Sequence, residues 1–179
     1  SRTGASPAAS GARRSTVRDN AGLPPGKHLH TLQRMRILVT GAAGFIGSNF
    51  TRHWVEQHPD DHVVAYDLLT YAGNRESVAD LEDRIVFVEG DIADAELTER
   101  TLRDEEVEVV VNFAAESHNS LAVVDPGRFF RTNVLGTQGL CEAARRVGVG
   151  RFHHVSTCEV YGDLDLDAAE PFTEDSPYR

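Results

Sequence analysis

Three glycines, Gly41, Gly44 and Gly47, have the spacing of a turn that binds phosphate groups. They follow the apolar run 37–39 and precede an amphipathic pattern, so the predicted order is strand, tight turn and helix. In such a turn the backbone comes close to a pyrophosphate, and the helix N-terminus faces its negative charge. Asp67 follows Gly47 by 20 residues, the separation expected for a carboxylate that binds the adenosine ribose. The sequence therefore predicts a dinucleotide-binding site.

The charge at residue 67 indicates which dinucleotide binds. Asp67 places a carboxylate where the 2′-phosphate of NADP would lie, and no arginine follows it before Arg75. Two anions repel each other there, whereas the neutral ribose hydroxyl of NAD can donate a hydrogen bond to the carboxylate. We therefore expect NAD as the cofactor.

The elements that position these residues alternate between strand and helix patterns, which predicts a parallel sheet with helices on both faces. The expected strands cover residues 36–40, 62–66, 85–88, 107–114 and 152–156. The expected helices cover residues 45–58, a short segment capped by Asp94, and 126–147, which ends at Gly148. The predicted fold class is α/β, a Rossmann-like doubly wound parallel sheet of about five strands.

A sheet of this kind binds ligands at the carboxyl ends of its strands, beside the point where the strand order reverses. We expect that point between the first and fourth strands. The residues that follow the five strands are Gly41, Asp67, Asp91, Ala115 and Thr157. The alternative is a purely structural role, in which Asp91 only caps the following helix.

Apolar spacing predicts which side chains face the sheet. On the first helix these are Ile46, Phe50 and Trp54, and on the long helix they are Val134, Leu140, Ala144 and Val147, which would face the sheet or a partner. We expect Cys141 to be a small core residue, His153 and His154 to be structural, and Tyr161 to pack beneath the site.

Residues 1–34 differ in composition from the rest of the chain. They hold six basic residues against one acidic residue and show no apolar periodicity. We expect a disordered or non-native leader, with Met35, the only methionine, as the native start. An organellar transit peptide is the other interpretation. Residues 35–179 would then be the N-terminal part of the dinucleotide-binding domain.

The whole chain carries a net charge of −10 and has a pI near 5.2, which argues against nucleic acid as a partner. Its two cysteines form no disulfide framework, and no apolar run is long enough to span a membrane. We expect a cytoplasmic protein with no membrane contact and no metal site.

Five segments resemble the extended short-chain dehydrogenase/reductases, and in particular their dTDP-glucose 4,6-dehydratase branch. Four of them are Thr40–Gly47, Asp67–Asn74, Gly90–Ile92 and Phe113–His118, a fifth is Thr132–Thr137, and Ser156–Gly162 shows the same resemblance. The resemblance covers residues 35–179, and the segments Thr-Tyr-Ala-Gly-Asn and Ala-Ala-Glu-Ser-His discriminate best among family branches.

The resemblance implies a role for each matching residue. The cofactor-binding residues would be Gly41, Gly44, Phe45, Ile46, Gly47, Asp67, Leu68, Leu69, Thr70, Asp91, Ile92, Ala114, Ala115, Glu116, Ser117 and Thr132. The substrate-binding residues would be Ser117, His118 and Thr157, and the catalytic residues would be Thr157, Cys158 and Glu159. The implied partners are a nucleotide sugar and, in the full-length protein, a second copy of the chain.

The implied reaction converts dTDP-glucose to its 4-keto-6-deoxy product. NAD accepts the C4 hydride, water leaves across C5–C6, and the hydride returns to C6. The C4 ketone acidifies the neighbouring C5 proton, so that a carboxylate such as Glu159 can remove it.

The chain departs from the family pattern at three places. Cys158 stands where the family has an aspartic acid that donates a proton, and 119–122 replaces Val-Asp-Arg-Ser beside the sugar pocket. Lys27 is the only lysine, so the chain contains no Tyr-x-x-x-Lys motif. We therefore expect this chain to be the N-terminal part of a longer enzyme, and we expect the chain to have no activity by itself. A UDP-sugar dehydratase, decarboxylase or epimerase, or a non-catalytic NAD-binding relative, are the alternatives.

Overall fold

The computed structural model describes residues 34–164 and 170–179. In this part of the chain one parallel sheet has the strand order β3-β2-β1-β4-β5. The strands are β1 (Arg36–Thr40), β2 (His62–Asp67), β3 (Ile85–Glu89), β4 (Val109–Asn112) and β5 (Arg151–His154). The chain crosses from one side of β1 to the other between β3 and β4, which confirms the predicted doubly wound, Rossmann-like fold and its switch point between β1 and β4.

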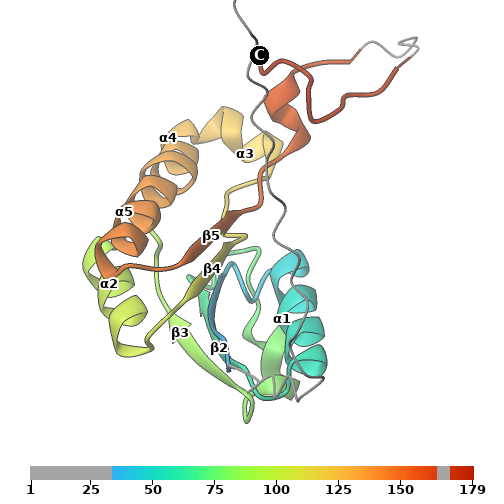
Figure 1. The fold of residues 1–179 in the computed structure, drawn as a ribbon. Helices are drawn as coiled ribbons and strands as arrows, with labels where there is room; N and C mark the ends of the chain where they lie inside the picture. The colour runs from blue at the N-terminus through green and yellow to red at the C-terminus, as the bar shows by residue number, and fades with distance from the viewer. Residues whose placement is uncertain (1–33, 165–169) are drawn as a thin grey trace, which may run out of the picture. The chain divides into compact units, whose positions relative to one another are not determined.

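Helices cover both faces of the sheet, with α1 on one side and α2 and α5 on the other (Figure 1). The α-helices are α1 (Phe45–Gln57), α2 (Ala95–Asp104), α3 (Asn119–Val124), α4 (Pro126–Phe129) and α5 (Thr137–Val147). Two 3-10 turns, η1 (Arg75–Leu81) and η3 (Cys158–Tyr161), and one π-helical segment, η2 (Phe130–Gly136), complete the described elements.

Strand side chains alternate between two core layers, as the period of two in a β-strand requires. Leu38 on β1 packs with Leu102 of α2 and Leu140 of α5, whereas its neighbours Ile37 and Val39 pack towards α1. All five of these side chains are fully buried or nearly so. Burial of one such side chain stabilises the fold by about 1.5–3 kcal/mol, so the two layers hold the strand ends in fixed positions.

Some predicted helix faces are wrong in detail. Phe50 and Trp54 pack against the core as expected, but Ile46 is 62% exposed because it lies in the first turn of α1, beside the glycine turn. Leu140 and Ala144 face the sheet, whereas Val134 is 53% exposed. Cys141 is exposed rather than a core residue, since a rotation of about 100° per residue carries it away from the face that Leu140 buries.

The predicted continuous helix over 126–147 is interrupted. The segment Phe130–Gly136 is π-helical and lies between α4 and α5. A π-helical turn is wider than an α-helical turn and redirects the side chains it carries. Here it carries Asn133, whose amide contacts the backbone of Glu116.

Other boundaries differ from the sequence prediction. β4 ends at Asn112 and β5 spans Arg151–His154, so the segments after both strands are longer than expected. The turns η1 and η3 and the short helix α3 were not predicted. In η1 the Asn74 side chain accepts a hydrogen bond from the Glu76 backbone N–H at 3.0 Å, a local capping contact.

Arg34 is the only residue of the predicted leader that the structure describes, so the prediction for residues 1–33 lies outside the described residues. Within the described ranges, no helix has the length and apolar character that crossing a membrane requires.

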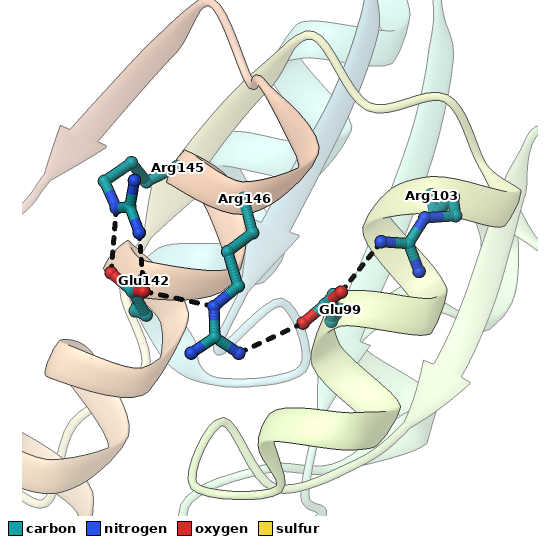
Figure 2. A network of polar contacts seen from close by, with 5 residues as sticks. All are labelled: Glu99, Arg103, Glu142, Arg145 and Arg146. Atoms are coloured by element: carbon teal, nitrogen blue, oxygen red, sulfur yellow. Dashed lines mark hydrogen bonds and ion pairs between the residues drawn. The ribbon is translucent and has the colours of Figure 1, made fainter.

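A network of glutamate and arginine side chains joins the outer surfaces of α2 and α5 (Figure 2). Arg146 links the two helices, because it lies 3.1 Å from Glu142 on its own helix and 3.5 Å from Glu99 on α2. Arg103 and Arg145 complete this surface network. The hydrogen bond from Arg145 is the largest cause that lowers the pKa of Glu142 to about 2.

Candidate dinucleotide-binding site

The glycine turn packs directly against the segment that follows β4. Gly41 has a φ of +65°, and a Cβ atom at this position would lie 2.8 Å from the backbone nitrogen of Ala114. A Cβ atom at Gly47 would overlap the carbonyl oxygen of Gly41. Both positions therefore require glycine. Exposed Phe45 and Ile46 begin α1, where the backbone N–H groups of a helix N-terminus are free to bind an anion.

Asp67 is buried at the end of β2, and the chain itself holds its carboxylate. One oxygen accepts a hydrogen bond from the Ala43 N–H at 2.9 Å, and the other accepts one from the Leu69 N–H at 2.8 Å. A carboxylate has about four acceptor positions, so two remain for ribose hydroxyls. Gly73 packs on the same carboxylate, and a Cβ atom there would lie 2.5 Å from it.

The loop 68–74 folds back over the glycine turn. The Asn74 N–H donates to the Ala43 carbonyl at 3.0 Å, and the Gly73 N–H donates to the Thr70 carbonyl at 3.1 Å. Leu69 has a φ of +55°, which is uncommon for a residue with a branched side chain. This conformation brings the predicted residues Leu68, Leu69 and Thr70 to the same strand end as Asp67.

Asp91 does not cap the helix that follows it. The cap of α2 is Asp94, which accepts from the Leu97 N–H at 3.0 Å. The Asp91 carboxylate instead accepts from the Ala93 N–H at 2.8 Å and from Arg131 at 2.9 Å. Ile92 is 3% exposed and its side chain lies in the core, so it presents almost no surface to a ligand.

The predicted residues after β4 alternate in exposure. Ala115, Ser117 and His118 are exposed, whereas Glu116 between them is buried. The Glu116 carboxylate accepts hydrogen bonds from the Tyr71 hydroxyl at 3.0 Å and from Arg128 Nε at 2.6 Å. Its carboxylate is therefore engaged by the protein.

Asn133 fixes the backbone of this segment. Its amide accepts from the Glu116 N–H at 2.8 Å and donates to the Glu116 carbonyl at 2.9 Å. The neighbouring Thr132, also predicted to line the site, is half-buried on the same π-helical segment. The roles of Tyr71, Arg128 and Asn133 were not predicted, although the first and last belong to segments that the family resemblance singled out.

A chain of polar side chains also crosses the sheet at one register position. Thr40, Asn112 and His154 lie opposite one another on β1, β4 and β5. The Thr40 hydroxyl bonds to the Asn112 amide oxygen, and the Asn112 amide nitrogen lies 3.0 Å from His154 Nδ1. This contact agrees with a structural role for His154, and it ties together the three strand ends that carry the site.

The predicted catalytic residues lie on the turn η3, beyond the end of β5. The Thr157 hydroxyl oxygen accepts from the Glu159 N–H at 3.3 Å, and the side chains of Thr157, Cys158 and Glu159 are exposed. β4 and β5 are adjacent, so Ser117 and Thr157 follow neighbouring strand ends. Tyr161 stacks on Phe172, with ring centroids 5.2 Å apart.

The parallel sheet thus brings the glycine turn, Asp67 and the segment after β4 to the same edge, and the η3 turn follows the adjacent strand β5. Among the side chains of the described ranges, no group of three or more His, Cys, Asp or Glu residues has the geometry of a metal site.

Comparisons with known proteins agree with this geometry. The family model described as GDP-mannose 4,6 dehydratase matches residues 38–179. A dTDP-glucose 4,6-dehydratase of Mycobacterium tuberculosis is 57% identical over 145 residues, which make up 81% of this chain and 43% of that protein. The chain therefore spans less than half the length of this curated relative.

Two solved structures place the same fold in an NAD-binding context. One is the dTDP-glucose 4,6-dehydratase DesIV of Streptomyces venezuelae, solved with NAD bound. Its sequence is 48% identical and the TM-score is 0.75; the match covers 81% of this chain and 45% of the DesIV chain. The other is a UDP-glucose 4-epimerase of Thermus thermophilus in complex with NAD. Its sequence is 34% identical and the TM-score is 0.73; the match covers 81% of this chain and 44% of the epimerase chain.

Proposed function

The chain belongs to the GDP-mannose 4,6 dehydratase family, and from that premise we propose that residues 35–179 form the N-terminal, dinucleotide-binding part of an NAD-dependent nucleotide-sugar dehydratase. The observation that carries the proposal is the buried Asp67 carboxylate, held by two backbone N–H groups beside a glycine turn. The solved relatives with the same fold contain NAD.

The surroundings of Asp67 favour NAD over NADP. The first arginine after it, Arg75, lies 4.1 Å from the centre of the Phe87 ring and pairs with Glu82. The Arg75 guanidinium is therefore engaged by Phe87 and Glu82, and it does not point towards the place of a 2′-phosphate. Titration calorimetry of the full-length protein with both cofactors tests this proposal. We expect NAD to bind at least tenfold more tightly, because the phosphate would meet an uncompensated carboxylate. Equal or tighter NADP binding would contradict it.

For the reaction, we propose dTDP-glucose as the substrate. Ser117, His118 and Thr157 would contact the sugar, and Glu159 would remove the C5 proton after NAD has taken the C4 hydride. Water then leaves across C5–C6 and the hydride returns to C6. The exposure of Glu159 and Cys158 on η3 leaves both side chains free to meet a sugar at the neighbouring strand ends. Formation of the 4-keto-6-deoxy product by the full-length protein tests the proposal.

Cys158 would supply the proton to the departing C6 oxygen. A thiol can donate a proton, although it is a weak hydrogen-bond donor. The Cys158→Ala variant of the full-length enzyme should oxidise C4 normally but eliminate water about 10²–10⁴-fold more slowly, with transient accumulation of NADH. Turnover near the wild-type rate would instead assign Cys158 a space-filling role.

A UDP-sugar epimerase is the second candidate, because the chain also resembles NAD-containing UDP-glucose 4-epimerases and carries Cys158 in place of aspartic acid. Epimerisation leaves the C6 hydroxyl in place, so mass spectrometry separates the two reactions by the loss of water. Binding of NAD without turnover of either sugar nucleotide would favour a non-catalytic relative.

We also propose that the full-length protein is a homodimer whose interface includes the region 119–147. Five large apolar side chains of this region are more than half exposed: Val123, Val124, Phe130, Val134 and Leu135. Such a surface on adjacent helical segments fits a second copy of the chain. Sedimentation of a Phe130→Asp variant as a monomer would support the interface, and an unchanged mass would contradict it.

A further inference from the structure

Tyr71, Glu116 and Arg128 form a cluster, here named the crevice clasp, that the proposed chemistry does not use. The Glu116 side chain is only 6% exposed, and its two carboxylate oxygens bond to Tyr71 and Arg128. The Arg128 guanidinium also lies 5.1 Å from the centre of the Tyr71 ring, within the range of a cation–π contact. Each of the three side chains therefore contacts the other two.

The three residues come from three separate segments. Tyr71 lies in the loop after β2, Glu116 in the segment after β4, and Arg128 in α4. β2 and β4 flank β1 in the sheet, and the glycine turn follows β1. The hydrogen bond between Tyr71 and Glu116 thus joins the two segments that lie on either side of the glycine turn.

Tyr71 joins the loop 68–74 to the segment that follows β4. The two ends of the loop are held to the glycine turn, by Asp67 through Ala43 and by Asn74 through the same residue. Between these points Tyr71 is 53% exposed, so packing alone holds it weakly. Its hydroxyl contact with the buried, paired carboxylate is a charge-assisted hydrogen bond, which is stronger than a bond between neutral groups.

We propose that the crevice clasp controls the release of the dinucleotide, because the loop that it fastens carries the ribose-binding residues. This inference rests on the proposed function. In that reaction the hydride must return to the same sugar, so a reduced cofactor that left in mid-cycle would end the turnover. Tyr71, Glu116 and Arg128 act as positioning residues: they hold the loop, and they do not touch the reacting atoms.

The Tyr71→Phe variant separates this role from a general contribution to stability. It removes one hydroxyl and keeps the ring, the Glu116–Arg128 pair and the fold. In the full-length protein we expect NADH, displaced by excess NAD and followed by its fluorescence, to dissociate about tenfold faster than from the wild type. The thermal midpoint of the cofactor-free variant should stay close to that of the wild type.

A matched control lies in the surface network. The Arg146→Met variant removes an arginine that pairs with one glutamate on α2 and one on α5, and NADH should leave this variant at the wild-type rate. In the crevice clasp, Arg128→Met should accelerate release, and Arg128→Lys should restore part of the slow release because it keeps the charge. A purely structural role would lower the thermal midpoint without this pattern.

Hydrogen exchange of the cofactor-free protein gives a second readout, because residues 68–74 should exchange faster in the Tyr71→Phe variant. Unchanged NADH release together with unchanged exchange in this loop would overturn the clasp alone. If the wild-type protein binds neither NAD nor NADH, the proposed function is wrong. The proposal that the crevice clasp slows cofactor release is then wrong as well.

Discussion

The crevice clasp and the surface network each contain a glutamate paired with arginine, but the two pairs lie in different surroundings. In the surface network, Glu142 pairs with Arg145 and Arg146, and all three side chains are substantially exposed. In the crevice clasp, Glu116 is 6% exposed and Arg128 is 37% exposed. Exposed ion pairs contribute little to stability, whereas loss of one partner from a buried pair leaves a charge without water.

This difference shows that a large effect of pairing on a pKa does not imply a large contribution to holding the fold together. The hydrogen bond from Arg145 is the largest cause that lowers the pKa of Glu142 to about 2, yet Glu142, Arg145 and Arg146 are residues of one helix. Glu116 joins segments that are 45 and 12 residues away in the sequence. What an ion pair contributes depends on its burial and on which segments it connects.

The largest expected effect is the loss of Glu116. The Glu116→Ala variant would leave Arg128 and the Tyr71 hydroxyl facing a cavity. We expect a loss of about 2–3 kcal/mol in the free energy of unfolding, below the value for a fully buried pair because Arg128 is partly exposed. Urea unfolding of the full-length protein measures the loss. The control Glu142→Ala should leave the midpoint nearly unchanged, and equal losses in the two variants would contradict the comparison.

Two glycines extend the comparison from side chains to backbone. The Gly73→Ala variant places a Cβ atom 2.5 Å from the Asp67 carboxylate, so the loop must shift and we expect NAD affinity to fall about tenfold, equivalent to about 1.4 kcal/mol. At Gly139, on α5, an added Cβ atom would make an ordinary van der Waals contact, with the Ile92 carbonyl oxygen 3.8 Å away. Gly139→Ala should keep NAD affinity and stabilise α5 by about 0.5–1 kcal/mol. Calorimetric titration of both variants distinguishes the two positions.

The smallest expected effect is that of pH on the surface network. The folded-state pKa of Glu142, about 2, lies below its ordinary value of 4.5. Its pairing therefore contributes stability above about pH 4.5, and this contribution is lost as the pH falls towards 2. The small difference in urea midpoint between the wild type and Glu142→Gln should vanish over that range, and also at 1 M salt. A difference that persists at pH 2 would mean that the carboxylate charge is not its cause.

Sequence patterns placed the carboxyl ends of β1, β2 and β3 to within one residue and those of β4 and β5 to within two, but they did not predict the contacts between the segments that follow the strands. The glycine turn and Asp67 were predictable because their spacing along the chain reflects a single strand–turn–helix unit. The contact between Tyr71 and Glu116 crosses the sheet between two loops, and no periodicity encodes it. The exposure of Val134 was missed for a different reason, since apolar spacing assumed one regular helix and Val134 lies on the π-helical segment that interrupts it.

The π-helical segment Phe130–Gly136 has a consequence for how the chain length of this family can vary. A π-helical turn accommodates one residue more than an α-helical turn, so it behaves as an insertion that the flanking helices absorb. Deletion of one residue between 130 and 136 should regularise the helix and leave Leu140 and Ala144 seated on the sheet. It should also turn Asn133 away from Glu116. The sheet would tolerate the shorter chain, but the backbone of Glu116 would lose its two hydrogen bonds to the Asn133 amide.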